Sequence, residues 1–319
     1  MIGLLILLAI ALALLVALLT TMLAWQMVHP PRHTAAWALA RGLPCDPNDL
    51  NLKFEEWWLD RPGGARLPVW EIEGRKKSGV RDQRAADSNT LIAVFIHGWG
   101  HARVDSLQRI DPFLPLVGRM VLYDLRGHGD STGSASTLGD GEDEDLRALL
   151  ERLGDGPFLL VGHSMGAVIA LRAATKAVGQ SSSVAQLISG LIAYGPYCDF
   201  HRSLQGRLHV NGLPARPLTD LALLIHRLRG VRPAGIAPQI LQGLHIPLLV
   251  VHGVNDRVSP LDHARRIADA AAGATLIEVE DAAHADSHSV DAARHEESIR
   301  QFVARLCARS SVTGAQVNA

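Results

Sequence analysis

The sequence predicts an α/β protein with a doubly wound, mostly parallel sheet, a small helical insertion and one apolar helix ahead of the domain. Between residues 91 and 309, short continuous apolar runs alternate with stretches of helical spacing. That alternation is typical of buried parallel strands joined by helices on both faces of the sheet. A second observation sets the start of the chain apart, because residues 2–28 contain no charged side chain.

Residues 1–28 are predicted to be a transmembrane anchor. As a helix the stretch would extend about 40 Å, more than the roughly 30 Å of hydrocarbon in a bilayer. A cleaved signal peptide is the alternative, but its apolar region normally runs for about 7 to 15 residues behind a positive segment. No Lys or Arg precedes this run. Arg32 and Arg41 follow it, so the positive-inside tendency places the domain on the cytoplasmic side.

Residues 29–50 are predicted to be a juxtamembrane linker, because four prolines lie in this short stretch. The domain is expected to span residues 51–309. It begins with two aromatic-rich strands, at 52–59 and 67–73, and the Arg-Pro-Gly-Gly turn between them favours a hairpin. The charged stretch 75–89 is predicted to be a solvated loop.

The remaining strands are each predicted from a short apolar run. These runs are 91–100, 119–127, 157–164, 187–196, 246–253 and 274–281, and helices are expected at 142–153, directly after 164, from about 260, and from about 290 to 309. Residues 197–244, approximately, break the rhythm with a proline-rich, helix-bearing insertion, and an insertion at such a place usually covers a site. Residues 310–319 are small and polar and are expected to form a flexible tail.

The composition excludes several functional classes. Lys and Arg total 31 against 32 for Asp and Glu, so no basic surplus is present to attract nucleic acid. Cys45, Cys198 and Cys307 are far apart and outside any C-x-x-C spacing, which indicates neither a disulfide framework nor a zinc site. The sequence indicates no metal or organic cofactor, and it leaves the oligomeric state open.

A serine lies on a tight strand-to-helix corner. Gly162–Gly166 reads G-H-S-M-G, with a strand pattern before it and a small-residue helical pattern after it. Such a turn strains the central residue, here Ser164, and presents its hydroxyl above the sheet. A serine hydroxyl is a poor nucleophile at neutral pH, so it needs a base within reach and donors for the developing oxyanion. The backbone N–H of Met165, at the start of the helix, is one candidate donor.

This corner is one of four motifs by which the chain resembles the α/β-hydrolase family, particularly its membrane-tethered and serine-aminopeptidase-like members. The others are H-G-W-G at 97–100, D-L-R-G-H-G-D-S at 124–131 and V-H-G-V-N-D-R-V-S-P at 251–260, and His284 follows the last strand. The resemblance runs from about residue 52 to residue 309. Two positions depart from the family pattern. Asp281-Ala-Ala-His284 replaces a stretch in which many relatives have a glycine, and Ala167 stands where a second glycine is common.

The resemblance implies a role for each motif. Ser164 would attack a carbonyl, His284 would take and return the proton, and Asp256 would hold the imidazolium. The backbone N–H groups of Trp99 and Met165 would form the oxyanion hole. The chain order Ser, Asp, His is the one expected for this fold.

The implied function is a membrane-anchored serine hydrolase that cleaves carboxylic esters through an acyl-enzyme. The elbow is similar to that of monoacylglycerol lipases, so a small-molecule or lipid-like acyl substrate is expected. The alternatives are a serine peptidase or thioesterase on the same triad, or a catalytically silent fold that only binds.

Several residues compete for these roles or have simpler ones. Asp199 is an alternative acid and His288 an alternative base. His284 and His288 with nearby aspartates could suggest a metal cluster, but the glutamate of H-E-x-x-H is absent. Arg126 is expected to tie loops together, and the acids that open the helix at 142–153 suit the helix dipole. His97 and His163 are expected to be packing residues.

Overall fold

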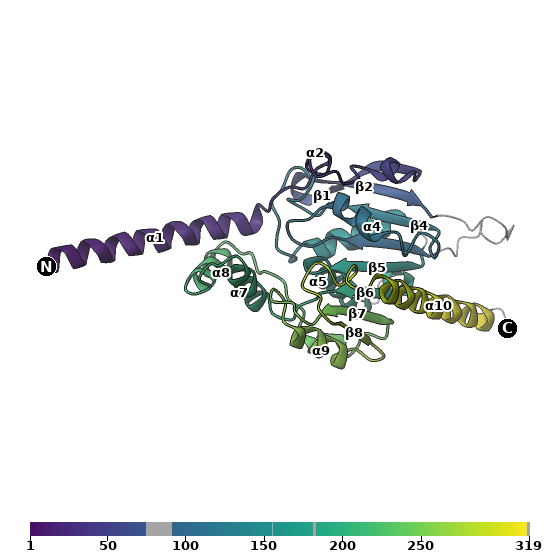
Figure 1. The fold of residues 1–319 in the computed structure, drawn as a ribbon. Helices are drawn as coiled ribbons and strands as arrows, with labels where there is room; N and C mark the ends of the chain where they lie inside the picture. The colour runs from purple at the N-terminus through teal and green to yellow at the C-terminus, as the bar shows by residue number, and fades with distance from the viewer. Residues whose placement is uncertain (75–90, 155, 181–182, 318–319) are drawn as a thin grey trace.

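The computed structural model describes residues 1–74, 91–154, 156–180 and 183–317. It contains an eight-stranded sheet in the order β1-β2-β4-β3-β5-β6-β7-β8 (Figure 1). The strands are β1 (Phe54–Arg61), β2 (Ala65–Glu73), β3 (Ile92–Ile96), β4 (Arg119–Tyr123), β5 (Phe158–His163), β6 (Ile188–Tyr194), β7 (Leu248–Gly253) and β8 (Thr275–Val279). The strand pairs β1–β2 and β2–β4 are antiparallel. All pairs from β4 onward in this order are parallel. The predicted α/β class with a mostly parallel sheet is confirmed.

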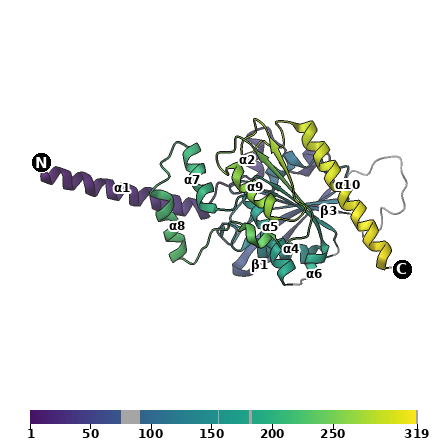
Figure 2. The same ribbon diagram turned by 90° about the horizontal axis from the view of Figure 1, so that it is seen from below.

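Helices cover both faces of this sheet (Figure 2). They are α1 (Ile2–Val28), α2 (Ala35–Leu39), α3 (Arg103–Ser106), α4 (Glu142–Leu153), α5 (Met165–Gly179), α6 (Ser183–Leu187), α7 (Phe200–Val210), α8 (Leu218–Leu228), α9 (Leu261–Ala270) and α10 (Ala292–Val317). Helices α4, α5, α6 and α9 share one apolar cluster with the sheet, and α3 and α10 share the other. Helix α1 projects away from the sheet, and its C-terminal end lies beside α8.

The central strands are buried on both faces. Val94 and Ile96 of β3 lie in one apolar cluster, whereas Ala93 and Phe95 lie in the other. Successive side chains of a strand point to opposite faces, so a continuous apolar run is needed when helices cover both sides. Burial of both faces therefore explains why these strands show no polar alternation in the sequence.

The hairpin of β1 and β2 forms as predicted, with Pro62–Gly64 in its turn. The predicted loop at 75–89 lies outside the described residues. Helix α10 continues to Val317, into the stretch for which the sequence predicts a flexible tail. Residues 310–317 contain no proline, so the helical backbone hydrogen bonds can extend past Arg309.

Residues 29–50 pack against the domain, although the sequence predicts a linker there. Arg32 Nη1 donates to the carbonyl oxygens of Gly129 and Ser131, at 3.1 and 2.7 Å. Ala38 in α2 is fully buried against the face of the sheet that α3 and α10 cover. These contacts fix the position at which α1 leaves the domain.

Candidate active site

Ser164 lies between the end of β5 and the start of α5, at the strained corner that the sequence predicts. Its φ of 53° and ψ of −113° lie in a region that residues other than glycine rarely adopt. The Ser164 N–H donates to the Tyr194 carbonyl at 2.7 Å, which holds the corner against β6. Backbone strain of this kind persists only where the surrounding structure imposes it, and it is concentrated at functional sites.

Gly162 and Gly166 let the backbones approach at this corner. A Cβ at Gly166 would lie well inside van der Waals contact of the Ile96 carbonyl oxygen, and one at Gly162 would collide with the backbone of Gly166 and Ala167. The obstacles are backbone atoms of β3 and α5, which cannot move aside without shifting a whole element. Glycine is therefore required at both positions.

We expect Gly166→Ala to lower the free energy of unfolding by about 3 kcal/mol, because the methyl group forces β3 and α5 apart. Urea denaturation of the detergent-solubilised protein, followed by tryptophan fluorescence, would measure the loss. Gly179→Ala is the matched control, since Gly179 ends the same helix and nothing lies within 4 Å of its added Cβ. Equal effects from the two substitutions would contradict the steric argument.

The structure brings Ser164, His284 and Asp256 into one hydrogen-bonded row. His284 Nε2 lies 2.8 Å from Ser164 Oγ, and His284 Nδ1 lies 2.7 Å from Asp256 Oδ2. A carboxylate only accepts, so Nδ1 carries the proton and Nε2 accepts from the serine hydroxyl. The three residues follow β5, β7 and β8, whose C-terminal ends meet at one edge of the sheet.

The Asp256 carboxylate is held in place by its own loop. Its Oδ1 accepts the backbone N–H groups of Val258 and Ser259, at 2.9 and 2.8 Å. His252 Nε2 lies 3.4 Å from Oδ2 but donates to the Ser259 carbonyl at 2.7 Å. Burial lowers the pKa of His252, so its ring is neutral at physiological pH. The sequence analysis missed His252, although it lies within the motif at 251–260.

The H-G-W-G loop passes directly beside the serine. A Cβ built on Gly98 would lie 3.3 Å from Ser164 Cβ and 3.2 Å from His163 Nδ1. His97 fixes the loop, because its Nδ1–H donates to the Gly98 carbonyl at 2.9 Å and its Nε2 accepts the Leu125 N–H at 3.0 Å. Trp99 and Met165, the predicted oxyanion donors, both line the pocket that contains Ser164.

The competing residues have other positions. Asp199 caps α7, and its side chain accepts the His201 N–H at 2.9 Å. His288 packs edge-on against His295, with ring centroids 6.4 Å apart, and burial lowers its pKa to about 4. His163 is buried, and its ring centroid lies 5.7 Å from that of His284. Burial lowers the pKa of His163 well below the usual value. His97 supports the H-G-W-G loop through its two hydrogen bonds, and the row of Ser164, His284 and Asp256 includes neither His97 nor His163.

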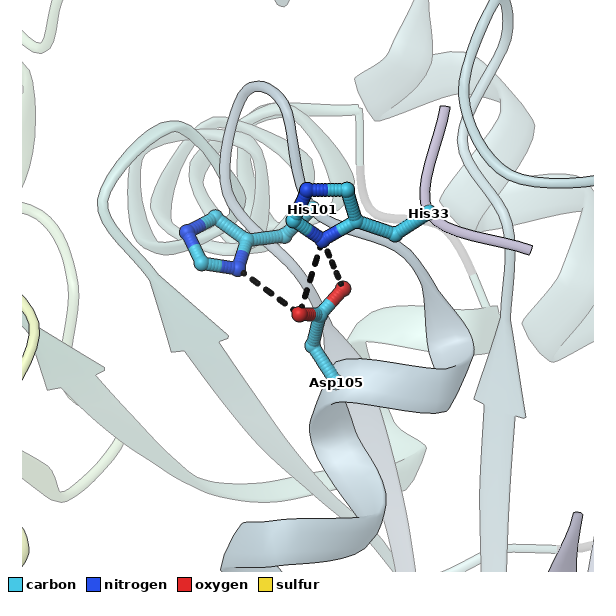
Figure 3. A group of neighbouring side chains, drawn as sticks. All are labelled: His33, His101 and Asp105. Carbon is cyan, nitrogen blue, oxygen red and sulfur yellow. Dashed lines mark hydrogen bonds and ion pairs between the residues drawn. The ribbon is translucent and has the colours of Figure 1, made fainter. Parts of the chain in front are cut away.

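One group of side chains has the composition of a metal site, and it lies where residues 29–50 meet the domain. His33 Nδ1 is 2.9 Å from both carboxylate oxygens of Asp105, and His101 Nδ1 is 3.3 Å from one of them (Figure 3). The same carboxylate accepts the Ala102 N–H at 2.7 Å, and His33 stacks on Trp37. Hydrogen bonds and stacking account for this geometry, so we assign the cluster to docking of residues 29–50.

A pocket of about 390 Å³ opens beside Ser164. Ser164 and Met165 form its floor, and Trp99, Leu138 and the inward face of α7 form its walls. Most of these walls are apolar, as in many sites for small organic ligands. The insertion predicted at 197–244 supplies α7 and therefore covers the site.

Comparison with known proteins bears on the family and the fold. The sequence model of a family described as "Alpha/beta hydrolase family" matches residues 93–297. An uncharacterised protein from Bacillus subtilis is 27% identical over 224 residues, which are 67% of this chain and 71% of that protein. A mouse sn-1-specific diacylglycerol lipase is 36% identical over 86 residues, 27% of this chain and 28% of that protein.

Solved structures resemble the chain over most of its length. An esterase from Pyrococcus furiosus superposes with a TM-score of 0.66 at 21% identity, covering 88% of this chain and 98% of that one. At this identity the likeness concerns the fold alone.

Proposed function

The chain belongs to the α/β-hydrolase family, and from this premise we propose that it is a membrane-anchored serine hydrolase that cleaves carboxylic esters through an acyl-enzyme on Ser164. The family and its esterase and lipase relatives make it a hydrolase of the esterase or lipase-like kind. The observation that carries the finer proposal is the hydrogen-bonded row from Ser164 through His284 to Asp256 at the floor of an apolar pocket.

In the proposed mechanism Ser164 Oγ attacks the ester carbonyl while His284 Nε2 accepts the hydroxyl proton. Asp256 stabilises the imidazolium that forms. The backbone N–H groups of Trp99 and Met165 receive the oxyanion, and Met165 N gains from its place at the start of α5. His284 then gives the proton to the leaving alcohol. Water, activated by the same imidazole, hydrolyses the acyl-enzyme and returns the serine.

Membrane anchoring is proposed for α1, the one helix in the described ranges that is long and apolar enough to cross a bilayer. A signal sequence passes the same test. Retention is supported by the end of the helix, where the last carbonyls have no partner within the helix. Trp99 Nε1 donates to the Met27 carbonyl at 2.8 Å, and the Ser136 N–H donates to the Val28 carbonyl at 3.0 Å. Removal of residues 1–28 would break both of these hydrogen bonds.

The orientation of the anchor follows from its flanks. Arg32 and Arg41 follow α1. Cytoplasmic flanks are enriched in Lys and Arg, so we place the domain on the cytoplasmic side of the membrane. Reaction of Cys307, which is exposed, with a membrane-impermeant thiol reagent in sealed and inverted vesicles would test this orientation.

A fluorophosphonate probe tests the proposed chemistry, because it reacts with a serine that is activated by a neighbouring imidazole. We expect the purified full-length protein in detergent to be labelled at Ser164 and to hydrolyse p-nitrophenyl esters faster than matched amides and thioesters. Absence of labelling in folded protein would favour a silent binding fold. Faster cleavage of amides or thioesters would assign the same row of residues to a peptidase or a thioesterase.

A further inference from the structure

The C-terminal end of α1 forms part of the pocket over Ser164. Leu23, Gln26 and Met27 line this pocket together with Ser164. Met27 is 3% exposed, whereas Leu4 and Leu14 are 63% and 66% exposed. The surroundings of α1 therefore change along its length. Its N-terminal part has no protein around it, and its C-terminal end forms a wall of the candidate active site.

The insertion holds this wall in place. His226 Nε2 of α8 lies 3.0 Å from the Ala24 carbonyl oxygen. Ala24 and Met27 of α1 share a small apolar cluster with Leu204 of α7 and Leu223 of α8. The α1 end and the insertion thus form one packed unit above the serine.

The outer face of the insertion is apolar where it lies beside α1. Leu221, Leu224 and Leu228 of α8 are 37%, 49% and 80% exposed. Their spacing of three and four residues places them in one stripe along the helix. Figures 1 and 2 show α7 and α8 beside the half of α1 that is nearest the domain. An exposed apolar stripe next to a membrane-spanning helix is suited to contact with the bilayer.

We propose that the end of α1 is part of the substrate-binding site and that the substrate is an acyl lipid that enters the pocket directly from the bilayer. This inference rests on the proposed function and names its substrate class. The acyl chain lies against Leu23 and Met27, so the ester carbonyl reaches Ser164 without the chain crossing water. Extraction of a long chain into water costs free energy for every CH₂ group that is exposed, and lateral entry avoids that exposure.

Leu23→Trp tests the wall, because the larger ring fills the pocket from the α1 side. We expect it to lower kcat/KM for 1-oleoylglycerol in phosphatidylcholine vesicles at least about tenfold more than kcat/KM for p-nitrophenyl acetate, which has no long chain to place against α1. Leu19→Trp is the control, since Leu19 lies one turn earlier, outside the pocket, and is 38% exposed. Equal losses on both substrates, or no loss on either, would overturn the role of α1.

Vesicle dilution tests the route of entry. At constant bulk 1-oleoylglycerol, added phosphatidylcholine lowers the mole fraction of substrate in the bilayer. The rate is expected to fall with that mole fraction, whereas a rate that follows the bulk concentration would overturn entry from the bilayer. Because labelling of Ser164 by the fluorophosphonate does not depend on chain length or vesicles, failure of this inference is distinguishable from failure of the proposed function.

A second observation concerns the charge inside this pocket. Arg207 of α7 lines the pocket, and its guanidinium carbon lies 4.9 Å from the centre of the Trp99 ring. Among the described residues, no carboxylate lies within ion-pair distance of Arg207. Most other arginines of the domain that are buried or half-buried form an ion pair with a carboxylate. Burial raises the pKa of the neighbouring Tyr197, so its hydroxyl stays neutral. Burial lowers the pKa of Arg207, but a guanidinium stays protonated in proteins because its ordinary pKa is so high.

We infer that Arg207 binds an oxyanion group of the substrate, a phosphate or a carboxylate, close to the ester that Ser164 attacks. Arg207 is partly buried, and its cation faces an aromatic ring rather than a carboxylate, so an anionic substrate would supply the missing countercharge. Arg presents several N–H donors in a planar fork that fits either group. The inference identifies Arg207 as a residue that determines specificity.

Two matched pairs of esters distinguish the sources of the anion. The first pair is 1-oleoylglycerol 3-phosphate and 1-oleoylglycerol, which differ only by a phosphate on the alcohol side. The second pair is the mono-p-nitrophenyl ester of octanedioic acid and p-nitrophenyl octanoate, which differ by a carboxylate on the acyl side. In at least one pair the wild type is expected to prefer the anion, and Arg207→Gln is expected to lower kcat/KM for it by about tenfold to a hundredfold through KM. The neutral ester is expected to change by less than about threefold.

The control is Arg229→Gln, which removes an exposed cation at the end of α8 and is expected to change neither ratio. Arg207→Lys keeps the charge and is expected to recover part of the preference. A uniform loss on charged and neutral esters would assign Arg207 to support of the Trp99 loop. That result, or a wild type with no preference for the anion in either pair, would overturn the inference.

Discussion

Ser164→Ala is expected to lower kcat for ester hydrolysis by about 10⁴-fold or more and to abolish labelling by a fluorophosphonate. The substitution removes the one oxygen that lies 2.8 Å from His284 Nε2. A methyl group cannot form the acyl-enzyme, and the remaining groups can only bind and polarise the substrate. Steady-state hydrolysis of p-nitrophenyl butyrate, with in-gel fluorescence of the labelled protein, would measure both effects.

Ser203→Ala is the matched control for this experiment. Ser203 lines the same pocket and is as buried as Ser164. It lies on α7 and is not part of the hydrogen-bonded row of Ser164, His284 and Asp256. It is expected to keep activity within about threefold of wild type. Persistent labelling of Ser164→Ala, or an equal loss in both variants, would exclude Ser164 as the nucleophile.

The sequence predicts the central geometry because the relevant signals are local. Each strand is a continuous apolar run, and each motif follows the strand that positions it. Ser164, Asp256 and His284 are far apart in the chain, yet strand order brings the C-terminal ends of β5, β7 and β8 to one edge. Knowledge of the fold therefore turns three local patterns into one predicted site.

The departures from the family pattern are accommodated locally. Asp281, which begins the stretch that lacks the glycine of many relatives, adopts a φ of 61°. Aspartate tolerates this left-handed conformation better than most residues. The Asn255 N–H donates to the Ala282 carbonyl at 2.9 Å, and the Asp286 carboxylate accepts the Ala283 N–H at 2.6 Å. These bonds set the position of the following histidine without a glycine.

Long-range partners could not be predicted in the same way. Arg126 ties loops together as expected, but its partner is Asp145 of α4, which its guanidinium contacts through two nitrogens. Asp145 is fully buried and also accepts from Arg61 Nε at 2.8 Å. The sequence analysis assigned the acids of this helix to the helix dipole alone. A charge on an amphipathic helix looks the same in sequence whether it faces water or a buried arginine.

The role of α1 was hidden for a similar reason. Its composition is uniformly apolar, so no residue distinguishes the part that faces lipid from the part that faces the pocket. Only the docking of residues 29–50 on the domain turns Leu23 and Met27 toward the serine. Arg207 is likewise an ordinary basic residue in a helical pattern until the fold encloses it.

His284→Ala and His288→Ala are expected to have very different effects, which makes them the sharpest test of the proposed base. His284→Ala removes the imidazole that lies between Ser164 and Asp256, and kcat is expected to fall by about 10³-fold or more. His288→Ala is expected to stay within about threefold of wild type, because that ring packs against His295 rather than the serine. Position separates them: a base must lie within hydrogen-bond reach of the proton that it takes, and His284 Nε2 lies 2.8 Å from Ser164 Oγ. Comparable losses in kcat from both substitutions, in variants with unchanged thermal unfolding, would remove His284 from the role of base.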